Sequence, residues 1–517
     1  MSFKRSNKSR CWLLLIIILL AAGCGQQTGT EIKAHMTPTT DKTNTPPTSS
    51  PPEPTIQPVT PTAAPSAINP LTGLEVADPS LLDLPAVLVS ISTFPAIARP
   101  QSGLSFAPYV FEFYITKGST RFLAAFYGEF PAPEIPGIGD CEVRREPFNQ
   151  TDLMLGNRVW LDENKNNLQD DWERGVSGVC VSLFDANDNL LAQTSTDSNG
   201  YYGFNVGAGV YSIAAENPGA MEFTQANAGD EEKDSDVDQA TGRSDALDVT
   251  SPLLHLDIGL VPPETPSPIL ELPPARVGPV RSGRLIYRHI ARFFEDSCLI
   301  YAYASYEVLE KLPYCAFVDH NIQGGGYMLD VSEMVGLANE RMDTTTSDNY
   351  ASNIFSSAPP EGGAPAAKLD VFYAWLNQTG WVYDPLSQSW WRYVDESNEK
   401  TAGILHPEID RLTGRQLQFE NVVVLFARHE VISPTNLDIR LDRGRIGKGY
   451  LFRDGRIYTI QWSVEDDAPI QFQYEDGNPF PLKPGKTWVT VVTLATTVTE
   501  KKPGEWFVRF YEPSTSE

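Results

Sequence analysis

The chain has 517 residues, which is too many for one hydrophobic core and predicts about two to four domains. Hydrophobic residues make up 41% of it, so most of the chain is expected to be globular. The formal net charge is −26, from 66 acidic and 40 basic residues. Because such an excess of acid would repel phosphates, the charge argues against a nucleic-acid partner and suits cations instead.

The first 24 residues have the order of a bacterial export signal. Lys4 and Arg5 begin a basic region, an apolar run extends from Trp12 to Ala22, and small residues precede Cys24. The run is short for a transmembrane helix. Its end resembles the bacterial lipobox, which implies that residues 1–24 are a lipoprotein signal peptide and that cleavage leaves a lipid on Cys24. The alternative is an uncleaved membrane anchor. Either places the remaining chain on the extracytoplasmic face, at the cell surface or in the periplasm.

Residues 25–68 predict an extended stalk, because they are rich in proline and threonine and have little to bury. Globular composition begins at Asn69. Apolar runs predict strands at 86–91, 109–115, 122–127, 299–303, 422–426, 458–462 and 487–494, and helices at 284–294 and 306–311. Asp454-Gly455 and Asp476-Gly477 predict hairpin turns. The pattern favours an α+β fold class, a mixed α/β globular unit with a strand-rich C-terminal part, interrupted by a β-domain.

Four cysteines remain once Cys11 and Cys24 are set aside, and an exported protein can oxidise them. Three pairings are possible, and sequence alone does not choose between them. The simplest prediction pairs the cysteines within each region, Cys141 with Cys180 and Cys298 with Cys315.

Residues 162–173 carry oxygen-bearing side chains at the spacing of an EF-hand-type calcium loop. The candidate ligands are the side chains of Asp162, Asn164, Asn166, Asp170 and Glu173 and the carbonyl of Leu168. Asn167 stands where the sharp turn usually needs glycine, and asparagine tolerates left-handed geometry comparatively well. A second acidic run adds the candidates Asp230, Asp234, Asp236 and Asp238. The alternative is a pair of solvated acidic loops.

The same part of the chain contains a series of further motifs. They are Gly156-Asn157-Arg158-Val159-Trp160-Leu161-Asp162, Gly175–Leu183, Thr196–Phe204, Phe223–Asp230 and Leu256-Asp257-Ile258-Gly259-Leu260. In this order they resemble the SdrD B-like repeats of bacterial surface adhesins, relatives of the Cna B-type domain. The resemblance implies that residues 150–262 form an inserted all-β sandwich with bound calcium, acting as a spacer or binding module.

Three short stretches outside that insert place arginine beside hydroxyl residues and glycine or proline. They span 99–105, 118–122 and 277–284, and their arginines are Arg99, Arg121, Arg281 and Arg284. The planar guanidinium suits carboxylate or phosphate, so these residues are candidates for an anionic-ligand site. The alternative is that they pair with internal acids such as Glu112 and fix loops.

Several motifs occur in order on both sides of the insert. They are Asn69-Pro70-Leu71-Thr72-Gly73-Leu74, the three arginine stretches, Tyr383-Asp384-Pro385-Leu386 and Gly485-Lys486-Thr487-Trp488. These motifs resemble the YerB-like lipoproteins, a family of unknown function. The resemblance implies an N-terminal domain in two segments, 69–135 and 275–368, and a C-terminal domain at 369–511.

Familiar catalytic motifs are missing from the sequence, which has no Gly-x-Ser-x-Gly elbow, His-Glu-x-x-His or P-loop. His406 and Asp410 could share a helical face as a base and its orienting acid, although Pro407 between them also fits capping or loop residues. An aromatic cluster comprises Trp375, Trp381, Trp390 and Trp391. These residues either face a sugar or belong to the core.

Two hypotheses remain. The first is a non-catalytic envelope protein that binds an anionic or glycan ligand. The second is a cell-envelope hydrolase or transferase that uses His406, Asp410 and Arg281. We favour the first, because the sequence shows no nucleophile.

Overall fold

The computed structural model describes residues 67–133, 139–143, 152–219, 221–263, 274–313, 315–317, 326–342, 350–433, 436–466 and 468–514. The expected signal peptide, with the expected lipid site Cys24, and nearly all of the expected stalk lie outside these ranges. No helix within them is long and apolar enough to cross a membrane.

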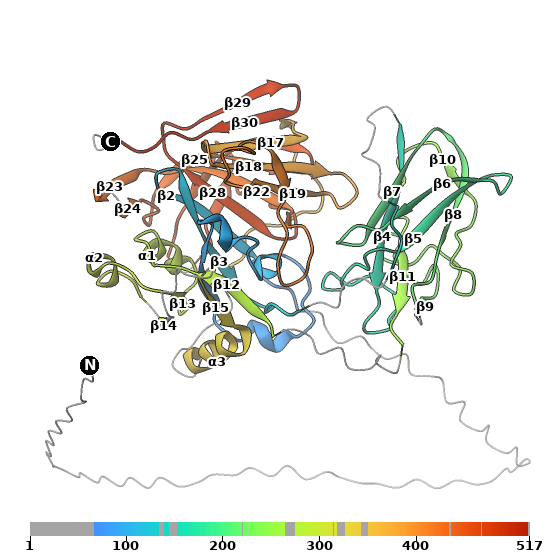
Figure 1. Ribbon diagram of the computed structural model, residues 1–517, viewed down its shortest axis with the longest axis horizontal. Coiled ribbons are helices and arrows are strands. Elements are labelled where there is room, and N and C mark those ends of the chain that lie inside the picture. Colours follow the sequence, from blue (N-terminus) through green and yellow to red (C-terminus); the bar gives the residue numbers. More distant parts are fainter. Residues whose placement is uncertain are drawn as a thin grey trace, which may run out of the picture. The chain divides into compact units, whose positions relative to one another are not determined.

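One large sheet combines strands from the first and the last parts of the described residues (Figure 1). Within the described residues its main path is β14 (Ala316–Phe317), β13 (Cys298–Tyr301), β1 (Val87–Ser92), β3 (Ser119–Phe126), β2 (Tyr109–Thr116), β28 (Thr487–Val492), β22 (Asn421–Phe426), β25 (Ile446–Arg453), β26 (Arg456–Ser463) and β16 (Ala364–Pro365). β12 (Arg276–Val280), β15 (Tyr327–Asp330) and β27 (Gln471–Gln473) pair at its sides. β1 and β22 are buried along their whole length, which is why they read as continuous apolar runs.

Pairing across the insert connects the two segments expected to form the N-terminal domain. β1 runs parallel to β13, with Val87 opposite Cys298, and antiparallel to β12, with Ile91 opposite Val280. β2 runs parallel to β28, with Tyr109 opposite Thr487. The sheet therefore continues from the first segment into the last third of the chain without a break.

A second sheet packs against the first. Its order is β20 (Leu405–Pro407), β19 (Ser389–Asp395), β18 (Asn377–Asp384), β17 (Lys368–Ala374), β30 (Glu505–Arg509) and β29 (Thr497–Lys502), and β21 (Gln418–Phe419) pairs with β19. The ring of Trp381 from β18 lies 5.4 Å from that of Trp488 in β28, between centroids. β23 (His429–Ser433) and β24 (Asn436–Ile439) form a separate hairpin.

The insert is a sandwich of two four-stranded sheets with a hydrophobic core of its own. One sheet has the order β10 (Leu247–Val249), β8 (Gly209–Ala215), β5 (Cys180–Asp185) and β6 (Leu190–Ser195). The other has the order β7 (Tyr201–Val206), β4 (Leu153–Leu161), β11 (Ile258–Val261) and β9 (Glu222–Phe223). The predicted all-β insert is confirmed.

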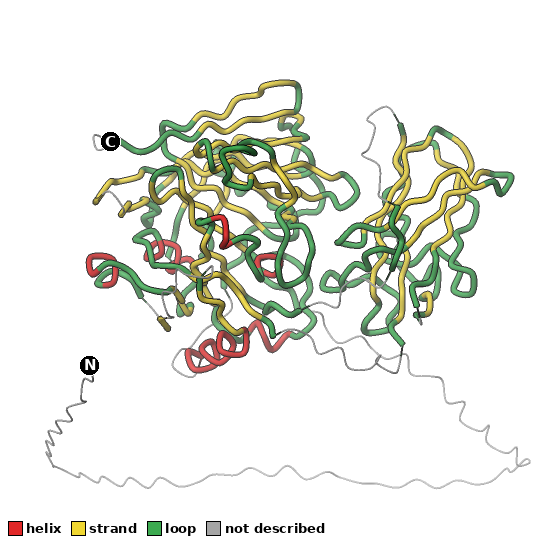
Figure 2. Tube along the Cα trace, viewed as in Figure 1, coloured by secondary structure: helices red, strands yellow, loops and turns green. Residues whose placement is uncertain are grey.

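The predicted strands are present, but the helical share of the predicted α+β class is small, as Figure 2 shows. The described helices are α1 (Tyr287–Ile290), α2 (Tyr306–Leu309), α3 (Val331–Met342) and the 3₁₀ turns Pro79–Leu82, Ala96–Ala98, Leu104–Phe106 and Ala291–Phe293. The helix expected at 284–294 shrinks to α1 and one 3₁₀ turn. The apolar residues of this segment are buried although most of it is not helical, and their spacing resembles that of a helix with one buried face.

Local predictions agree closely with the structure. Both predicted disulfides form, Cys141 with Cys180 and Cys298 with Cys315. Asp454 and Gly455 both have positive φ, 50° and 65°, and turn the chain from β25 into β26 as the sequence indicated.

A buried ionic centre lies between the two large sheets. Arg392 of β19, 1% exposed, donates to Glu408 and, over 3.2 Å, to Oε2 of Glu112 in β2. Trp488 of β28 donates to the same Glu112 oxygen over 3.2 Å, and its ring centroid lies 4.0 Å from the guanidinium carbon. Burial raises the pKa of Glu112 against the lowering effect of Arg392. Burial alone would lower the pKa of Arg392, but attraction by the two glutamates raises it.

Removing one acid from this centre is expected to destabilise the protein strongly. Glu112→Ala should lower the free energy of unfolding by about 3–5 kcal/mol, because it leaves Arg392 buried with one acid fewer. Urea unfolding followed by tryptophan fluorescence measures the change. The control Lys502→Ala breaks an exposed pair with Glu505 and should cost no more than about 0.5 kcal/mol. Equal losses in the two variants would contradict the central role of Glu112.

Candidate functional site

Three of the four candidate arginines line one pocket of about 460 Å³. Arg121 lies on β3, Arg281 directly follows β12, and Arg99 follows a 3₁₀ turn. Strand pairing brings them together, because Ser92 of β1 lies opposite Arg121 and the preceding Ile91 lies opposite Val280. The turn between β17 and β18 supplies a further wall.

Arg121 is a deeply buried charge in this pocket, and one of its donors lacks a partner. It is 4% exposed and donates from Nη1 to the carbonyl of Ser282 over 3.0 Å, but its Nε has no partner. Burial first, and then repulsion by Arg284 and Arg281, lowers the pKa of Arg121 to about 9 against the raising effect of Tyr287. The largest influences on its pKa in the described part of the chain include no Asp or Glu, but they do include a hydrogen bond with Tyr287.

Arg284 and Arg281 share this environment. Arg284 donates to the hydroxyl of Ser282 and the carbonyl of Gly283 over 3.0 and 2.8 Å, and its buried Nε lacks a partner. Burial lowers the pKa of both arginines, and Arg281 lowers that of Arg284 further. Together with Arg121 they form a cluster of three guanidinium groups, here called the arginine cluster.

Glu112 is not a partner of these arginines, because it pairs with Arg392. Arg99 does fix a loop. Its Nη1 donates to the carbonyl of Asp395 over 2.6 Å and lies 3.6 Å from the carboxylate of the same residue. Arg99 is therefore the one candidate of the four with a carboxylate partner among the described residues.

His406 and Asp410 have different surroundings. His406 lies in strand β20 and not on the expected helix, and its half-exposed ring is 3.7 Å from Glu396. Asp410 is buried and accepts the backbone N–H groups of Gly103 and Ser105 over 2.9 and 2.8 Å. No hydrogen bond or ion pair between described residues joins the two, and Asp410 holds the loop that follows Arg99.

The aromatic residues near this region belong mainly to the core. Trp381 and Trp390 are fully buried, and Trp391 is almost so. Trp375 is 62% exposed, in the turn between β17 and β18.

The predicted calcium loop of the insert closes on itself through its own acids. Asp162, fully buried, accepts the N–H groups of Asn166 and Asn167 over 3.0 Å each. Glu173 accepts the N–H of Asp170 over 3.1 Å. Asn167 has φ of 67°, the left-handed geometry expected at this position. The side chains spaced along the sequence therefore converge on one small region.

The remaining candidates of this loop lie around Asp170. The amides of Asn164 and Asn166 donate to its carboxylate over 2.6 and 3.1 Å, and the N–H of Leu168 donates to Asn166 over 2.8 Å. Burial, followed by repulsion from Asp162 and Asp170, raises the pKa of Glu173 to about 7.

The second acidic run divides into two pairs. Asp230 and Asp238 accept N–H groups of their own turns. Asp234 is buried and Asp236 is partly buried, and Asp234 has a buried oxygen without a partner. Asp236 accepts the N–H of Asp257 over 2.6 Å, and burial, then repulsion by Glu231 and Asp234, raises its pKa to about 7.

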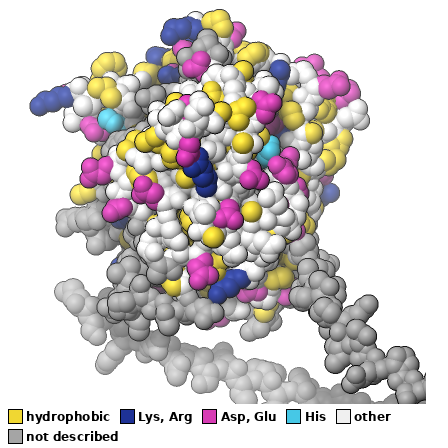
Figure 3. All heavy atoms as spheres, turned by 90° about the vertical axis from the view of Figure 1, so that its right-hand side faces the viewer, with side chains coloured by type: hydrophobic (Ala, Val, Ile, Leu, Met, Phe, Trp, Pro, Cys, Tyr) yellow, Lys and Arg dark blue, Asp and Glu magenta, His cyan; other side chains and the backbone are white. Residues whose placement is uncertain are grey.

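Asp257 is a residue that sequence reasoning missed. It is fully buried, and burial followed by repulsion from Asp236 raises its pKa well above the ordinary range. The signal in the sequence was an acid directly before the apolar final strand β11. Within the described ranges, no group of three or more His, Cys, Asp or Glu side chains is placed so that it could hold a metal ion. Acidic side chains are spread over the face seen in Figure 3, and basic ones are few.

Family comparisons agree with this architecture. Residues 153–260 match the SdrD B-like domain. Residues 71–148 match the N-terminal domain, and residues 369–489 the C-terminal domain, of a protein family of unknown function, DUF3048. The chain thus carries an SdrD B-like domain between the two DUF3048 domains.

Relatives of the insert come from staphylococci. Serine-aspartate repeat-containing protein F of Staphylococcus epidermidis is 49% identical over 104 residues, 20% of this chain and 6% of that protein. The fibrinogen-binding protein of the same species is 44% identical over 107 residues, 20% and 10% of the two chains. Serine-aspartate repeat-containing protein D of Staphylococcus aureus is 44% identical over 97 residues, 18% and 7%. The chain therefore spans a tenth or less of the length of these relatives.

A solved structure similar to this chain is that of YerB from Bacillus subtilis. The sequence identity is 18%, the TM-score is 0.44, and the match covers 82% of this chain and 96% of that one.

The raised pKa values in the insert predict a pH dependence of stability without calcium. In the folded chain the pKa values of Glu173 and Asp236 are both about 7, above the ordinary values of 4.5 and 3.8 for these side chains. The folded state binds more protons between these values, so stability falls as pH rises through about 7. In chelator, thermal unfolding of the full chain followed by circular dichroism should show a higher insert transition near pH 5 than near pH 8. Glu173→Gln should flatten this slope, and an insert transition that rises with pH would contradict it.

Proposed function

We propose that this protein is a lipid-anchored, extracytoplasmic binding protein whose arginine cluster holds an anionic ligand of the cell envelope. The observation that carries the proposal is the buried Nε of Arg121, which lacks a partner while two further guanidinium groups lie beside it. Burying cations together without a counter-charge is costly. An anion in the pocket would receive charge-assisted hydrogen bonds and would relieve the repulsion among the three arginines.

Three features support an envelope location. The order of residues 1–24 resembles a lipoprotein signal with Cys24 as the lipid site. The two disulfides suit an oxidising compartment outside the cytoplasm. The proline- and threonine-rich residues 25–68 would hold the folded part away from the membrane surface.

A binding role is favoured over the alternative of a hydrolase or transferase that uses His406, Asp410 and Arg281. Both carboxylate oxygens of Asp410 accept backbone N–H groups of the loop at Gly103 and Ser105. His406 has Glu396 beside it, in an exposed position. These contacts supply no support for a joint catalytic role.

We also propose that the insert binds calcium through Asp162, Asn164, Asn166, Leu168, Asp170 and Glu173 and becomes a stiff spacer. The turn at Asn167 and the convergence of Asp162 and Glu173 support this. The two asparagine amides would rotate to present oxygen to the ion. Calcium accepts such amide and backbone oxygens alongside carboxylates, and it would offset the repulsion that raises the pKa of Glu173. Asp234, Asp236 and Asp257 are candidates for a second ion.

Anion binding is tested with inorganic phosphate, pyrophosphate and glycerol 3-phosphate on the full chain. We expect at least one to raise the melting temperature and to give saturable heat in calorimetry, because it would neutralise the arginine cluster. Arg281→Gln should weaken this binding by about tenfold, the cost of about one charge-assisted hydrogen bond. The unliganded variant should be no less stable than the parent, since a like charge beside Arg121 is removed.

Arg276→Gln is the matched control, because Arg276 is exposed and pairs with Asp330. Its anion affinity should equal that of the parent. The proposal is wrong if none of the three anions binds, or if Arg281→Gln and Arg276→Gln behave alike.

Calcium binding is tested by titrating the chelator-treated full chain. Calcium at about 100 times its Kd should add about 2.7 kcal/mol to the stability of the insert. Asp162→Asn should abolish most of this gain, because Asp162 is the buried carboxylate on which the loop closes. Asp248→Asn, an exposed acid of the same domain, should leave it unchanged. If calcium gives neither binding heat nor stabilisation of the parent protein, the proposed calcium site is wrong.

A further inference from the structure

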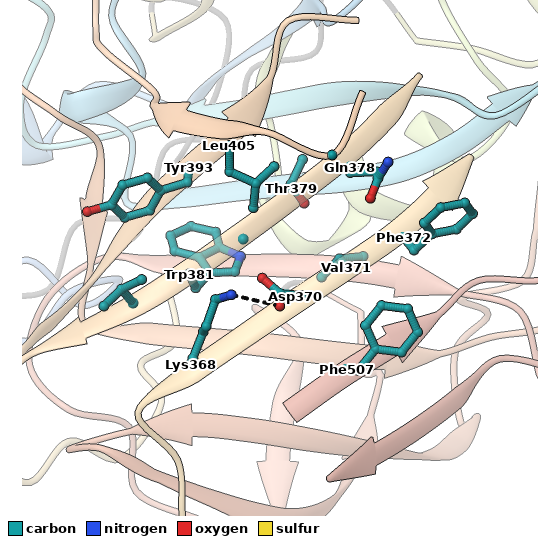
Figure 4. A pocket seen from close by; sticks show the side chains of 13 residues that line it. Lys368, Asp370, Val371, Phe372, Gln378, Thr379, Trp381, Tyr393, Leu405 and Phe507 are labelled. Atoms are coloured by element: carbon teal, nitrogen blue, oxygen red, sulfur yellow. Dashed lines mark ion pairs between the residues drawn. The ribbon is translucent and has the colours of Figure 1, made fainter. Parts of the chain in front are cut away.

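The second sheet carries a hollow on the face turned away from the core. Along β17, Leu369, Val371 and Tyr373 are buried, whereas Lys368, Asp370 and Phe372 are partly exposed. This alternation marks a strand with one face on the core and one face outward. The outward side chains border a pocket of about 370 Å³ (Figure 4).

Strand register produces the hollow. Gly380 of β18 lies opposite Tyr393 of β19 on one side and Asp370 of β17 on the other, and Asp370 lies opposite Phe507 of β30. This row across four strands therefore has an aromatic ring at each end, Tyr393 and Phe507, with Gly380 and Asp370 between them. A Cβ at Gly380 would lie 2.7 Å from Cδ1 of Leu405 and 3.1 Å from Oδ1 of Asp370. The missing side chain makes room for Leu405 and Asp370, and any substituent would push Leu405 aside and narrow the hollow.

The walls combine aromatic rings with groups that both donate and accept hydrogen bonds. Tyr393 and Leu405 lie on one side of the pocket, and Lys368, Asp370 and Phe507 lie on the other (Figure 4). Nζ of Lys368 is 3.0 Å from Oδ2 of Asp370, while Oδ1 of Asp370 is buried without a partner. Gln378 adds a carboxamide at the rim.

This chemistry fits one class of ligand. A carboxylate and an amide that accept, beside an ammonium group that donates, match a ring of hydroxyl groups. Partly exposed aromatic faces match the C–H face of a pyranose. A purely apolar ligand would leave Asp370 desolvated, and an anion would be repelled by it. The volume lies at the lower end of the range for small-ligand sites, which is large enough for one or two sugar units.

The hollow is separate from the arginine cluster but close to it in the fold. The two pockets share no lining residue, yet both use the β17–β18 hairpin. Asp395 connects them. Its Oδ2 accepts the backbone N–H of Gln378 over 2.9 Å, and its Oδ1 is 3.6 Å from Arg99.

We propose that the hollow above Gly380 is a saccharide-binding site that takes a neutral pyranose unit of an envelope glycan. Asp370, Lys368 and Gln378 hold its hydroxyl groups, and Tyr393 and Phe507 border its ring. The inference stands on contacts independent of the arginine cluster, so either site can fail without the other.

The test is titration of the full chain with three neutral oligosaccharides, chitotriose, cellotriose and maltotriose, followed by tryptophan fluorescence and calorimetry. Calorimetry is the primary measurement, because Trp381, although it is among the residues that line the hollow, is fully buried against Trp488. We expect saturable binding of at least one. Asp370→Asn should weaken it by about tenfold, the loss of about one charge-assisted hydrogen bond. Gly380→Ala should also weaken it, because the added methyl group would displace the flexible end of the Leu405 side chain and narrow the hollow.

Melting temperatures identify any variant that fails to fold, and Lys502→Ala, exposed on the neighbouring β29, should bind like the parent. Arg281→Gln should also leave the affinity for neutral saccharides unchanged while it lowers that for anions. Saccharide binding that is lost in Arg281→Gln, or that requires an acidic sugar, would assign the ligand to the arginine cluster and overturn the proposal. Failure of all three neutral oligosaccharides to bind would overturn it as well.

Discussion

The ionic centre of Arg392 with Glu112 and Glu408 is the constraint on which the two large sheets depend. A buried guanidinium is tolerable only when its acidic partners are also in place. Those partners come from β2 and from the loop after β20, while Trp488 of β28 covers the guanidinium. The first segment of the chain and its last third must therefore assemble together, and they share one continuous hydrophobic core.

Burial of a guanidinium charge has different consequences for Arg392 and for the arginine cluster. Arg392 has two carboxylates and three aromatic rings around it, so its charge is balanced within the fold, although its buried Nη1 has no hydrogen-bond partner. Arg121 is almost as deeply buried but has like charges beside it and an Nε without a partner. Both groups are built on neighbouring strands of one sheet. The anionic ligand proposed above would be the counter-charge for the second group, whereas the first has carboxylates of its own fold.

The insert has its own core and its own electrostatic problem. Its buried acids, among them Glu173, Asp236 and Asp257, repel one another and hold their protons above the usual range. A domain with a separate core can be inserted into a loop at small cost in closure entropy, without disturbing the host sheet. Strands β1, β12 and β13 still pair across it.

The sequence by itself determined what depends on neighbours in the chain. Continuous apolar runs marked β1, β2 and β22, the Asp454-Gly455 pair marked a hairpin, and the spacing from Asp162 to Glu173 marked the closed loop with Asn167 at its left-handed turn. Only the tertiary structure decided which distant residues meet. Strand register brought Arg99, Arg121 and Arg281 to one pocket, paired Glu112 with Arg392, placed Asp257 beside Asp236 and opened the hollow at Gly380. The reason is physical: turn and loop geometry is set by a few consecutive residues, whereas register is set by how buried faces pack across the whole sheet.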